Sequence, residues 1–146
     1  MRLCIAVILA IGVAACSGSD SPTAPTGQPA ANSIPFSTTD LRAGTGAEAT
    51  AGRNVTVNYT LWLYNTAGVD NKGSLIDSSL AAGRTPFAFT VGSGVITGFS
   101  QGVTGMKVGG LRRVVVPPNL GYGSQGSGSV PPNATLIFEI ELLSVQ

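Results

Sequence analysis

The sequence predicts an α+β domain in which an antiparallel β-sheet wraps around one short helix. Several segments alternate apolar and polar residues with period two, which is typical of strands that bury one face. Only one segment allows a helix, and a single small helix can cover one face of a sheet in a domain of this size. The 146-residue length predicts one folded domain, preceded by a tail.

Four segments predict strands in which alternate side chains are buried. They are residues 54–61, 86–92, 111–116 and 134–145. The inward side chains are expected to be Val55, Val57, Tyr59 and Leu61, then Phe87, Phe89 and Val91, and finally Leu136, Phe138, Ile140 and Leu142. Glu139 and Glu141 fall on the opposite side of the last strand. We therefore interpret these two carboxylates as a solvent-facing pair and not as an acid–base pair.

The helix is expected over residues 97–106, where glycines interrupt it, and the Gly-rich segments 66–74 and 121–129 are expected to be loops. Residues 121–126 also match the G-x-G-x-x-G pattern of dinucleotide sites. Such a site needs a helix N-terminus directly after the glycines. Gly, Ser and then Pro131-Pro132 follow here, so no helix can start and this interpretation is excluded.

The N-terminus is typical of an export signal. After Arg2, residues 3–15 are an uninterrupted apolar or glycine run of 13 residues, which is shorter than the roughly 20 residues of a membrane-spanning helix. Val13-Ala14-Ala15-Cys16 resembles the bacterial lipobox, which implies cleavage before Cys16 and acylation of its thiol. Ser17 favours the outer membrane, facing the periplasm, if the source is a diderm bacterium. An ordinary secretory signal with an incidental cysteine is the alternative.

These features divide the chain into three parts. Residues 1–15 form the lipoprotein signal peptide, residues 16–33 hold the acylated Cys16 and a flexible tether, and residues 34–146 form the folded domain. The tether is small, polar and proline-bearing, so it cannot bury enough apolar surface to fold. We expect an exported, lipid-anchored protein that contacts the membrane through this anchor.

The composition excludes several classes of function. The chain has no histidine, and both cysteines lie within the first 16 residues, which removes Ser-His-Asp and Cys-His catalysis and the usual nitrogen and sulfur metal ligands. A net charge of +1 gives no field to hold a polyanion, so no nucleic-acid partner is expected. Neither a metal nor an organic cofactor is implied.

Ordered motifs in the domain carry a resemblance to a known family. The motifs are Val57-Asn58-Tyr59-Thr60, Ile76-Asp77-Ser78-Ser79, Pro86-Phe87-Ala88-Phe89, Val95-Ile96-Thr97-Gly98-Phe99, Pro118-Asn119-Leu120-Gly121-Tyr122-Gly123 and Val130-Pro131-Pro132-Asn133-Ala134-Thr135-Leu136-Ile137-Phe138. In this order they resemble the FKBP-type peptidyl-prolyl cis–trans isomerases over about residues 36–145. The last two motifs are the most specific.

The resemblance implies a proline isomerase that acts on proline-containing polypeptides, together with a set of site residues. The catalytic group would be Asp77, Tyr122, Ile96 and Tyr59, and the substrate-binding group would be Phe87, Val95, Phe99, Phe138, Ile76 and Val130. The Ile96 N–H and the Tyr122 hydroxyl would each hold a substrate carbonyl, while Asp77 would orient Tyr59. For the apolar members, plain core packing is the alternative role.

The sequence departs from the family pattern around the pocket. Phe99 replaces the usual Trp at the pocket floor, and Ile76 replaces an aromatic residue at the rim. Ser127-Gly128-Ser129 replaces a more apolar flap, and about seven extra residues lie between Leu61 and Ile76. We expect these changes to alter substrate preference and to weaken macrolide binding, while the reaction type is kept.

Three functions remain open from the sequence. The first is an isomerase that assists the folding of exported proteins. The second is a non-catalytic chaperone or surface interaction module that binds proline-containing segments, and the third is a structural lipoprotein with a degenerate pocket. The retention of Asp77, Ile96 and Tyr122 favours the isomerase, because a pure binder need not keep all three. We expect the protein to be a monomer.

Overall fold

A computed structural model of the chain describes residues 34–146. Its elements are β1 (Ser37–Arg42), β2 (Asn54–Tyr64), η1 (Val69–Asn71), β3 (Lys72–Ser78), β4 (Phe87–Thr90), α1 (Thr97–Val103), β5 (Leu111–Val116), η2 (Pro118–Leu120) and β6 (Leu136–Val145). The strands form one sheet in the order β1-β5-β6-β2-β3, and β4 pairs with the N-terminal half of β2. Every pairing is antiparallel, so the predicted fold class is confirmed.

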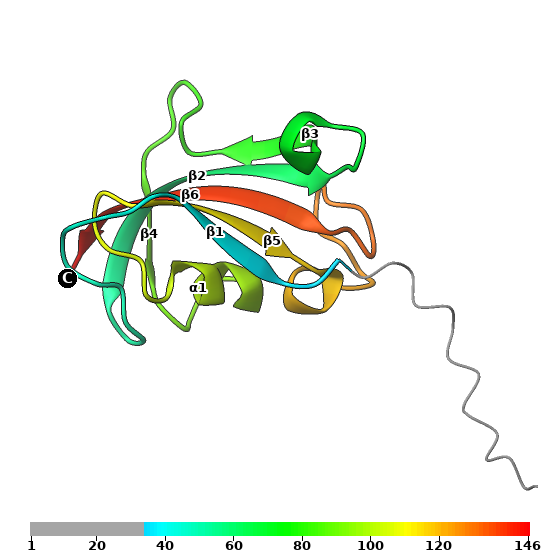
Figure 1. Cartoon of the computed structure of the whole chain (residues 1–146). Coiled ribbons are helices and arrows are strands. Elements are labelled where there is room, and N and C mark those ends of the chain that lie inside the picture. Colours follow the sequence, from blue (N-terminus) through cyan, green and yellow to red (C-terminus); the bar gives the residue numbers. More distant parts are fainter. Residues whose placement is uncertain (1–33) are drawn as a thin grey trace, which may run out of the picture. The chain divides into compact units, whose positions relative to one another are not determined.

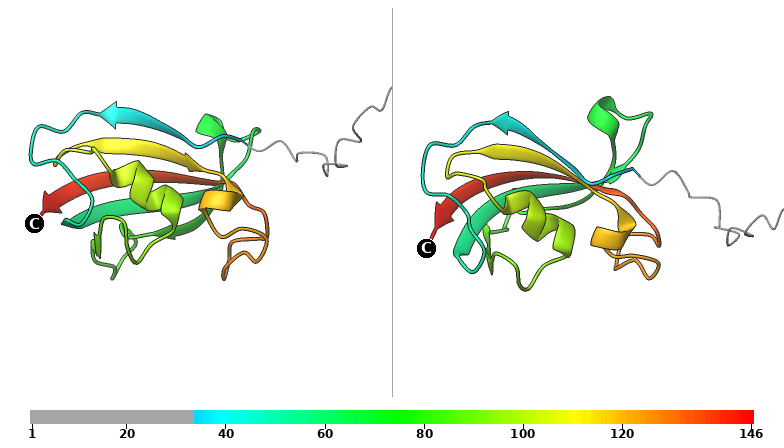
Figure 2. Two further views of the ribbon diagram at one scale, coloured as in Figure 1. Left: turned by 90° about the horizontal axis from the view of Figure 1, so that it is seen from below. Right: turned by 60° about the horizontal axis from the view of Figure 1, so that its bottom comes forward.

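The two longest strands, β2 and β6, lie side by side in the middle of the sheet (Figure 1). The α1 helix covers one face of the sheet, where it packs mainly on β5 (Figure 2). We call this helix-covered side the inner face. The opposite side is called the outer face, and it carries the polar positions of the alternating strands.

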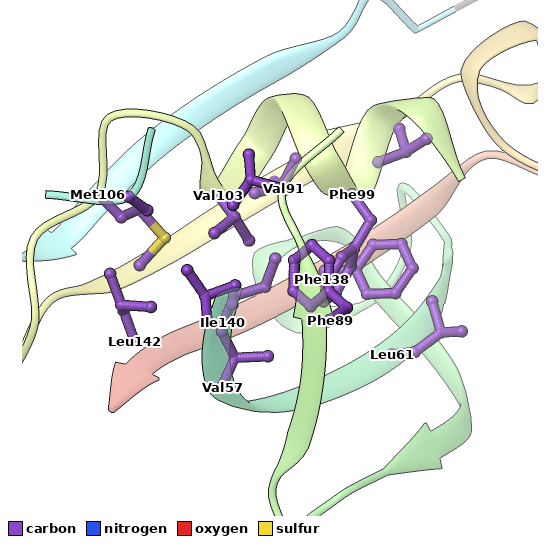
Figure 3. Packing of buried hydrophobic residues seen from close by; sticks show 14 of the residues in the cluster. Val57, Leu61, Phe89, Val91, Phe99, Val103, Met106, Phe138, Ile140 and Leu142 are labelled. Atoms are coloured by element: carbon purple, nitrogen blue, oxygen red, sulfur yellow. The ribbon is translucent and has the colours of Figure 1, made fainter. Parts of the chain in front are cut away.

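The predicted alternation of buried side chains is confirmed on the central strands. Val55, Val57 and Leu61 of β2 are buried, while the Thr and Asn residues between them are partly exposed. The four predicted residues of β6 are buried in the same way. Side chains from both strands meet those of α1 and β4 in one hydrophobic core (Figure 3). Burial of this alternating face is what fixes the register of the sheet.

The glycines that interrupt the helix have a packing role. Gly98 and Gly102 are four residues apart, so they lie on the same face of α1. A Cβ at Gly98 would approach Val116 to 2.4 Å, and a Cβ at Gly102 would approach Val114 to 2.6 Å. The helix backbone therefore lies closer to β5 than any side-chain-bearing residue would allow. The helix ends at Val103 and not at Met106, because residues 104–106 turn away from it.

Two strands were not predicted from the sequence. The β1 segment is exposed throughout and polar except for Leu41, so it has no alternation to detect. The β3 segment begins at Lys72, inside the range predicted as a Gly-rich loop, so that loop prediction is wrong from Lys72 onward. Both are edge strands of the sheet, held by backbone pairing to β5 or β2. Such strands need only one partner and little burial of their own.

The bounds of the predicted strands shift by a few residues. The first continues through Tyr64, because β3 extends the hairpin beyond the predicted end. The second is shorter, at Phe87–Thr90, and the last begins at Leu136, after the turn at Pro132-Asn133. The 111–116 strand has the predicted bounds. The glycine pattern at 121–126 lies in turns that lead through a bridge between Ser127 and Val130 to β6.

Ion pairs occupy the outer face. Glu139 accepts from Lys72, at 2.6 Å, and from Arg113, at 3.0 Å, while Glu141 pairs with Arg42. The Lys72 ammonium also lies 4.5 Å from the centre of the Trp62 ring, within range of a cation–π interaction. The two glutamates therefore neutralise cations on the side of the sheet that faces away from α1.

Arg113 connects this face to the segment that is longer than the family pattern. Its guanidinium donates to Asp70 of η1, at 3.0 Å, as well as to Glu139. The turn between β2 and β3 is thus held against the sheet. The predicted signal peptide, Cys16 and tether lie outside the described residues. Within residues 34–146 there is no helix with the length and apolarity to cross a bilayer.

Candidate active site

A cavity of about 530 Å³ opens at one end of the core, next to the N-terminus of α1. Its lining comes from β2, β3, β4, α1, β6 and the two loops that precede α1 and follow η2. The lining residues are Tyr59, Leu61, Asp77, Phe87, Gly94, Val95, Ile96, Phe99, Tyr122 and Phe138. Five of these are aromatic, and the volume is typical of a small-ligand site.

The aromatic rings meet edge to face. Tyr59 lies 5.9 Å from both Phe87 and Phe99, measured between ring centres, with interplanar angles of 77° and 84°. Phe99 lies 5.1 Å from Phe138 at an angle of 74°. Rings prefer this arrangement because the positive edge of one meets the negative face of the other. The rings therefore support one another and leave a fixed apolar hollow between them.

One carboxylate faces this apolar hollow and is held from both sides. The Tyr59 hydroxyl donates to Asp77 at 2.6 Å, and Arg84 donates to the other oxygen of the same carboxylate. The hydrogen bond from Tyr59, together with the Arg84 pair, lowers the pKa of Asp77 below its ordinary value. Burial and the bond to Asp77 raise the pKa of Tyr59 to about 12. Asp77 is therefore ionised, and Tyr59 is a neutral donor, across the physiological range.

Backbone pairing fixes the position of Asp77. It lies in β3 directly opposite Leu61 of β2 and so points to the inner face. Beyond it, buried Ser79 accepts a hydrogen bond from the Tyr59 N–H, at 2.9 Å, and its own N–H donates to the Tyr59 carbonyl, at 2.9 Å. The tyrosine and the aspartate are therefore held by the same pair of strands.

Two hydrogen-bond donors at the cavity lack partners among the described residues. Ile96 precedes α1 with an extended backbone (φ −59°, ψ 147°); its carbonyl accepts from Phe99 and Ser100, but its N–H meets no acceptor within residues 34–146. In the same part of the chain, no protein group bonds the Tyr122 hydroxyl. A hydrogen bond from the Gly123 N–H to Pro118, at 2.9 Å, holds the Tyr122 loop in place.

The structure brings together eight of the ten predicted site residues. Asp77, Tyr122, Ile96, Tyr59, Phe87, Val95, Phe99 and Phe138 all line the cavity. Ile76 and Val130 do not line it. Ile76 sits at the irregularity where Leu61 pairs with Asp77 and Trp62 pairs with Leu75, and it is half-buried against the core. Val130 is buried within the core itself, behind the 127–130 bridge.

Two lining residues were missed as site residues. Leu61 belongs to the inward set of the β2 strand, so the alternation that placed Tyr59 could also have indicated Leu61. Gly94 has a φ of +76° in the turn before α1, and nothing in the sequence distinguishes it from the other loop glycines. Both lie beside residues that the motifs did identify.

The side chains that line the cavity within residues 34–146 can bind a ligand and polarise its carbonyl groups, but they include no serine, cysteine or lysine nucleophile. Its titratable groups are Asp77, Tyr59 and Tyr122. Within the described residues, no three His, Cys, Asp or Glu side chains come together as a metal site would require. The cavity can enclose a small apolar ring and offer hydrogen bonds to neighbouring carbonyls. Such a site suits a reaction in which no covalent bond is made or broken.

Comparison with known proteins agrees with this geometry. The sequence model described as "FKBP-type peptidyl-prolyl cis-trans isomerase" matches residues 46–143. A curated "FK506-binding protein" of Neisseria meningitidis is 49% identical over 108 residues, which cover 73% of this chain and 92% of that protein. A chloroplastic "Peptidyl-prolyl cis-trans isomerase FKBP16-4" of Arabidopsis thaliana is 42% identical over 112 residues, 73% of this chain and 46% of that protein.

Solved structures show the same likeness. The crystal structure of FkpA from Escherichia coli matches 76% of this chain and 48% of that chain, with a TM-score of 0.65 and 36% identity. A peptidyl-prolyl cis-trans isomerase from Pseudomonas syringae matches 76% of this chain and 75% of that chain, with a TM-score of 0.62 and 33% identity. The chain therefore belongs to the FKBP-type peptidyl-prolyl cis–trans isomerases and isomerises X-Pro bonds in polypeptides.

Proposed function

We propose that the aromatic cavity is where isomerisation takes place, and that the chain's own side chains divide the work there. Tyr59, Phe87, Phe99 and Phe138 enclose the proline ring, with Val95 and Ile96 closing the cavity. The Ile96 N–H and the Tyr122 hydroxyl each donate to a substrate carbonyl. Asp77 orients Tyr59 and polarises the site, and Ile76 and Val130 support the walls from behind.

The physical basis is differential binding of a rotated amide. Rotation about the C–N bond must overcome a barrier of about 18–20 kcal/mol because it breaks the amide resonance. The twisted amide is less dipolar than either planar form, so it loses less on leaving water for an apolar cavity. A cavity that binds the twisted form better than the planar forms lowers the barrier without a nucleophile or a general base.

One observation carries this assignment above the others: two donors without partners among residues 34–146 and one ionised carboxylate meet at a cavity that is walled mainly by aromatic and aliphatic side chains. An apolar ring alone could be held by the walls. The two donors can form hydrogen bonds with the peptide carbonyls on either side of the proline. This combination supports catalysis better than simple storage of an apolar ligand.

The test measures cis–trans exchange of a short X-Pro peptide, by protease-coupled kinetics or by NMR exchange. We expect the purified chain to raise the rate above background, and either Asp77→Ala or Tyr122→Phe to lower it several-fold while the fold is kept. A folded chain with no rate above background would leave the non-catalytic proline-segment-binding role. Equal rates in the wild type and both variants would contradict the assigned roles.

We further propose that the enzyme works outside the cytoplasm as a lipid-anchored monomer, at the outer membrane facing the periplasm if its source is diderm. The support is the sequence alone: the apolar run, the lipobox-like residues before Cys16 and the polar tether. Exported proteins fold there without ATP, and uncatalysed X-Pro isomerisation takes tens to hundreds of seconds. An anchored isomerase would assist the folding of such proteins as they emerge.

This location is tested by expressing the full chain in a bacterium and analysing its N-terminus by mass spectrometry. We expect a diacylated or triacylated Cys16 at the new N-terminus and recovery of the protein with membranes. Cys16→Ser should abolish the acylation and release the protein from the membrane fraction. An unmodified Cys16, or cleavage elsewhere, would favour an ordinary secretory signal. Size-exclusion chromatography with light scattering checks the monomer.

A further inference from the structure

We propose that the free edge of β3 is a second binding surface for the polypeptide substrate, on which an extended segment next to the X-Pro bond adds as a further strand. This inference rests on the proposed function of the cavity, because the added segment belongs to the same chain that the cavity holds. β3 ends the strand order of the sheet. One side of β3 pairs with β2, and within residues 34–146 no strand pairs with the other side.

Exposed apolar side chains occur in β3 and in the residues that flank it in the chain. Leu75 of β3 is 61% exposed, and Val69 and Leu80, which flank the strand in the chain, are 86% and 67% exposed. Among the described residues only six large hydrophobic side chains are exposed, and these three are half of them. A fourth, Phe87, is 36% exposed where it lines the cavity. Four of these six exposed side chains therefore belong to β3, its flanking residues and the cavity lining.

The edge is continuous with the cavity. Asp77 lines the cavity and lies two residues from Leu75 in the same strand, which corresponds to about 7 Å at the rise of a strand. The register places Asp77 opposite Leu61 on the inner face and Leu75 opposite Trp62 on the outer face. A substrate chain that leaves the cavity past Asp77 therefore needs only two or three extended residues to reach Leu75.

The opposite edge of the sheet, β1, has features that protect an edge strand from pairing with another chain. β1 follows Pro35, and its Asp40 and Arg42 side chains are 57% and 54% exposed. Proline and exposed charge on an edge discourage pairing with another strand. The charged side chains of β1 and β3 are all paired within the domain, but those of β3 are less exposed, at 23% for Lys72 and 34% for Asp77. The β3 edge thus presents less exposed charge than the β1 edge.

These features define the occupant as an unfolded, apolar stretch of polypeptide. An open strand edge offers backbone donors and acceptors that any extended chain can pair with, whatever its sequence. The side chains beside this edge favour apolar residues on the occupant. A folded protein cannot supply such a segment, and a tetrapeptide with X-Pro at its centre extends only one residue beyond the cavity on either side, which is too short to reach the edge. The edge should therefore matter for unfolded proteins and not for short peptides.

The experiment compares two substrates in two matched variants of the purified chain. Leu75→Lys puts a charge on the β3 edge, and Leu41→Lys puts the same charge on the β1 edge, where Leu41 is 43% exposed. The substrates are an X-Pro tetrapeptide and reduced, carboxymethylated ribonuclease T1, whose refolding in high salt is limited by proline isomerisation. We expect Leu75→Lys to keep the tetrapeptide kcat/KM within twofold and to slow catalysis of refolding at least fivefold. Leu41→Lys should change neither.

Three results would overturn the proposal. They are an unchanged refolding rate in Leu75→Lys, an equal loss on both substrates, and the same loss in Leu41→Lys. If circular dichroism shows that Leu75→Lys does not fold, Leu75→Thr, which removes the exposed apolar side chain but keeps a residue that favours strands, takes its place with the same expected pattern. A wild-type chain that is inactive on the tetrapeptide would contradict the function of the cavity and not the role of the edge, so the two failures are distinguishable.

Discussion

The two ends of the hydrophobic core are built from different side chains (Figure 3). At one end Val57, Val103, Met106 and Leu142 fill the space between α1 and the sheet, and each is at most 2% exposed. We call this the closed end. At the other end Phe99, Phe138 and their neighbouring rings leave the cavity of about 530 Å³ between them. We call this the open end.

The difference separates stability from function within one core. Flexible and branched aliphatic chains can interdigitate, so they fill the closed end and stabilise the fold. Rigid rings at the open end support each other edge to face and cannot collapse into the space between them. Substitutions at the closed end should therefore change the free energy of unfolding. Substitutions that remove a polar group at the open end should instead change kcat/KM.

The largest effect is expected at the closed end. Leu142→Ala should lower the free energy of unfolding by about 2–5 kcal/mol, because it removes a fully buried side chain and leaves a cavity. Urea unfolding followed by circular dichroism measures this, and kcat/KM per folded molecule should not change. Leu143→Ala is the matched control, since Leu143 is the next residue on β6 and is 36% exposed. Equal costs in the two variants would contradict the comparison.

The next effect is expected at the open end. Asp77→Ala should lower kcat/KM on an X-Pro tetrapeptide by about five- to tenfold, or up to about 1.4 kcal/mol of transition-state stabilisation. The free energy of unfolding should stay within about 1 kcal/mol of the wild type, as for most substitutions away from core packing. Asp40→Ala is the control, because Asp40 also pairs with an arginine but lies on β1. A loss of stability without a loss of rate would show that Asp77 is structural.

A smaller effect on kcat/KM is expected at the Tyr122 hydroxyl, one of the two hydrogen-bond donors of the cavity. Tyr122→Phe removes one hydroxyl and should lower kcat/KM about threefold, in line with the loss of a single hydrogen bond. The ring stays, so unfolding should be unaffected. Tyr64→Phe serves as the control, since Tyr64 lies at the end of β2 and is not part of the cavity lining. If both variants lose activity to the same extent, the Tyr122 hydroxyl has no specific role.

The smallest effect on kcat/KM is expected from a change of pH. Asp77 has a lowered pKa and the pKa of Tyr59 is raised to about 12, so kcat/KM on the tetrapeptide should be flat between about pH 5 and pH 9. A bell-shaped profile in that range would contradict these assignments.

The same shifts fix the sign of the stability change. The lowered pKa of Asp77 stabilises the fold above its ordinary value of 3.8, and that contribution is lost as the pH falls through the folded-state pKa. For Tyr59 the contribution is present below its ordinary value of 10.0 and is lost as the pH rises towards 12. Unfolding monitored at pH 2 to 12 should show both declines.

The sequence predicted the parts of the fold that bury an alternating face. Val55, Val57 and Leu61 indicate β2, because a strand that buries only one face has apolar residues at every second position. The edge strands β1 and β3 were not predicted, because they are held by backbone pairing with a neighbouring strand. Such pairing leaves no pattern in their own side chains. Edge strands become visible only when the partner is known.

The motifs indicated most of the residues that line the cavity, and the alternation alone could not have done so. Tyr59 and Phe87 face inward by alternation, yet alternation cannot tell a cavity wall from a filled core. Ile76 shows the limit, because an irregularity in the β2–β3 register turns Asp77 into the cavity and leaves Ile76 out of its lining. The Arg84 contact to Asp77 bridges seven positions and a loop, and no periodicity indicates it.

The most direct test of the contrast between the two ends is a titration of the ¹⁵N-labelled chain with a proline-containing peptide, followed by amide chemical shifts. We expect shifts at Gly94, Ile96 and Tyr122 around the open end, and none at Val103 or Met106 of the closed end. Shifts confined to the closed end, or a peptide that isomerises without shifting any of the three open-end amides, would contradict the account.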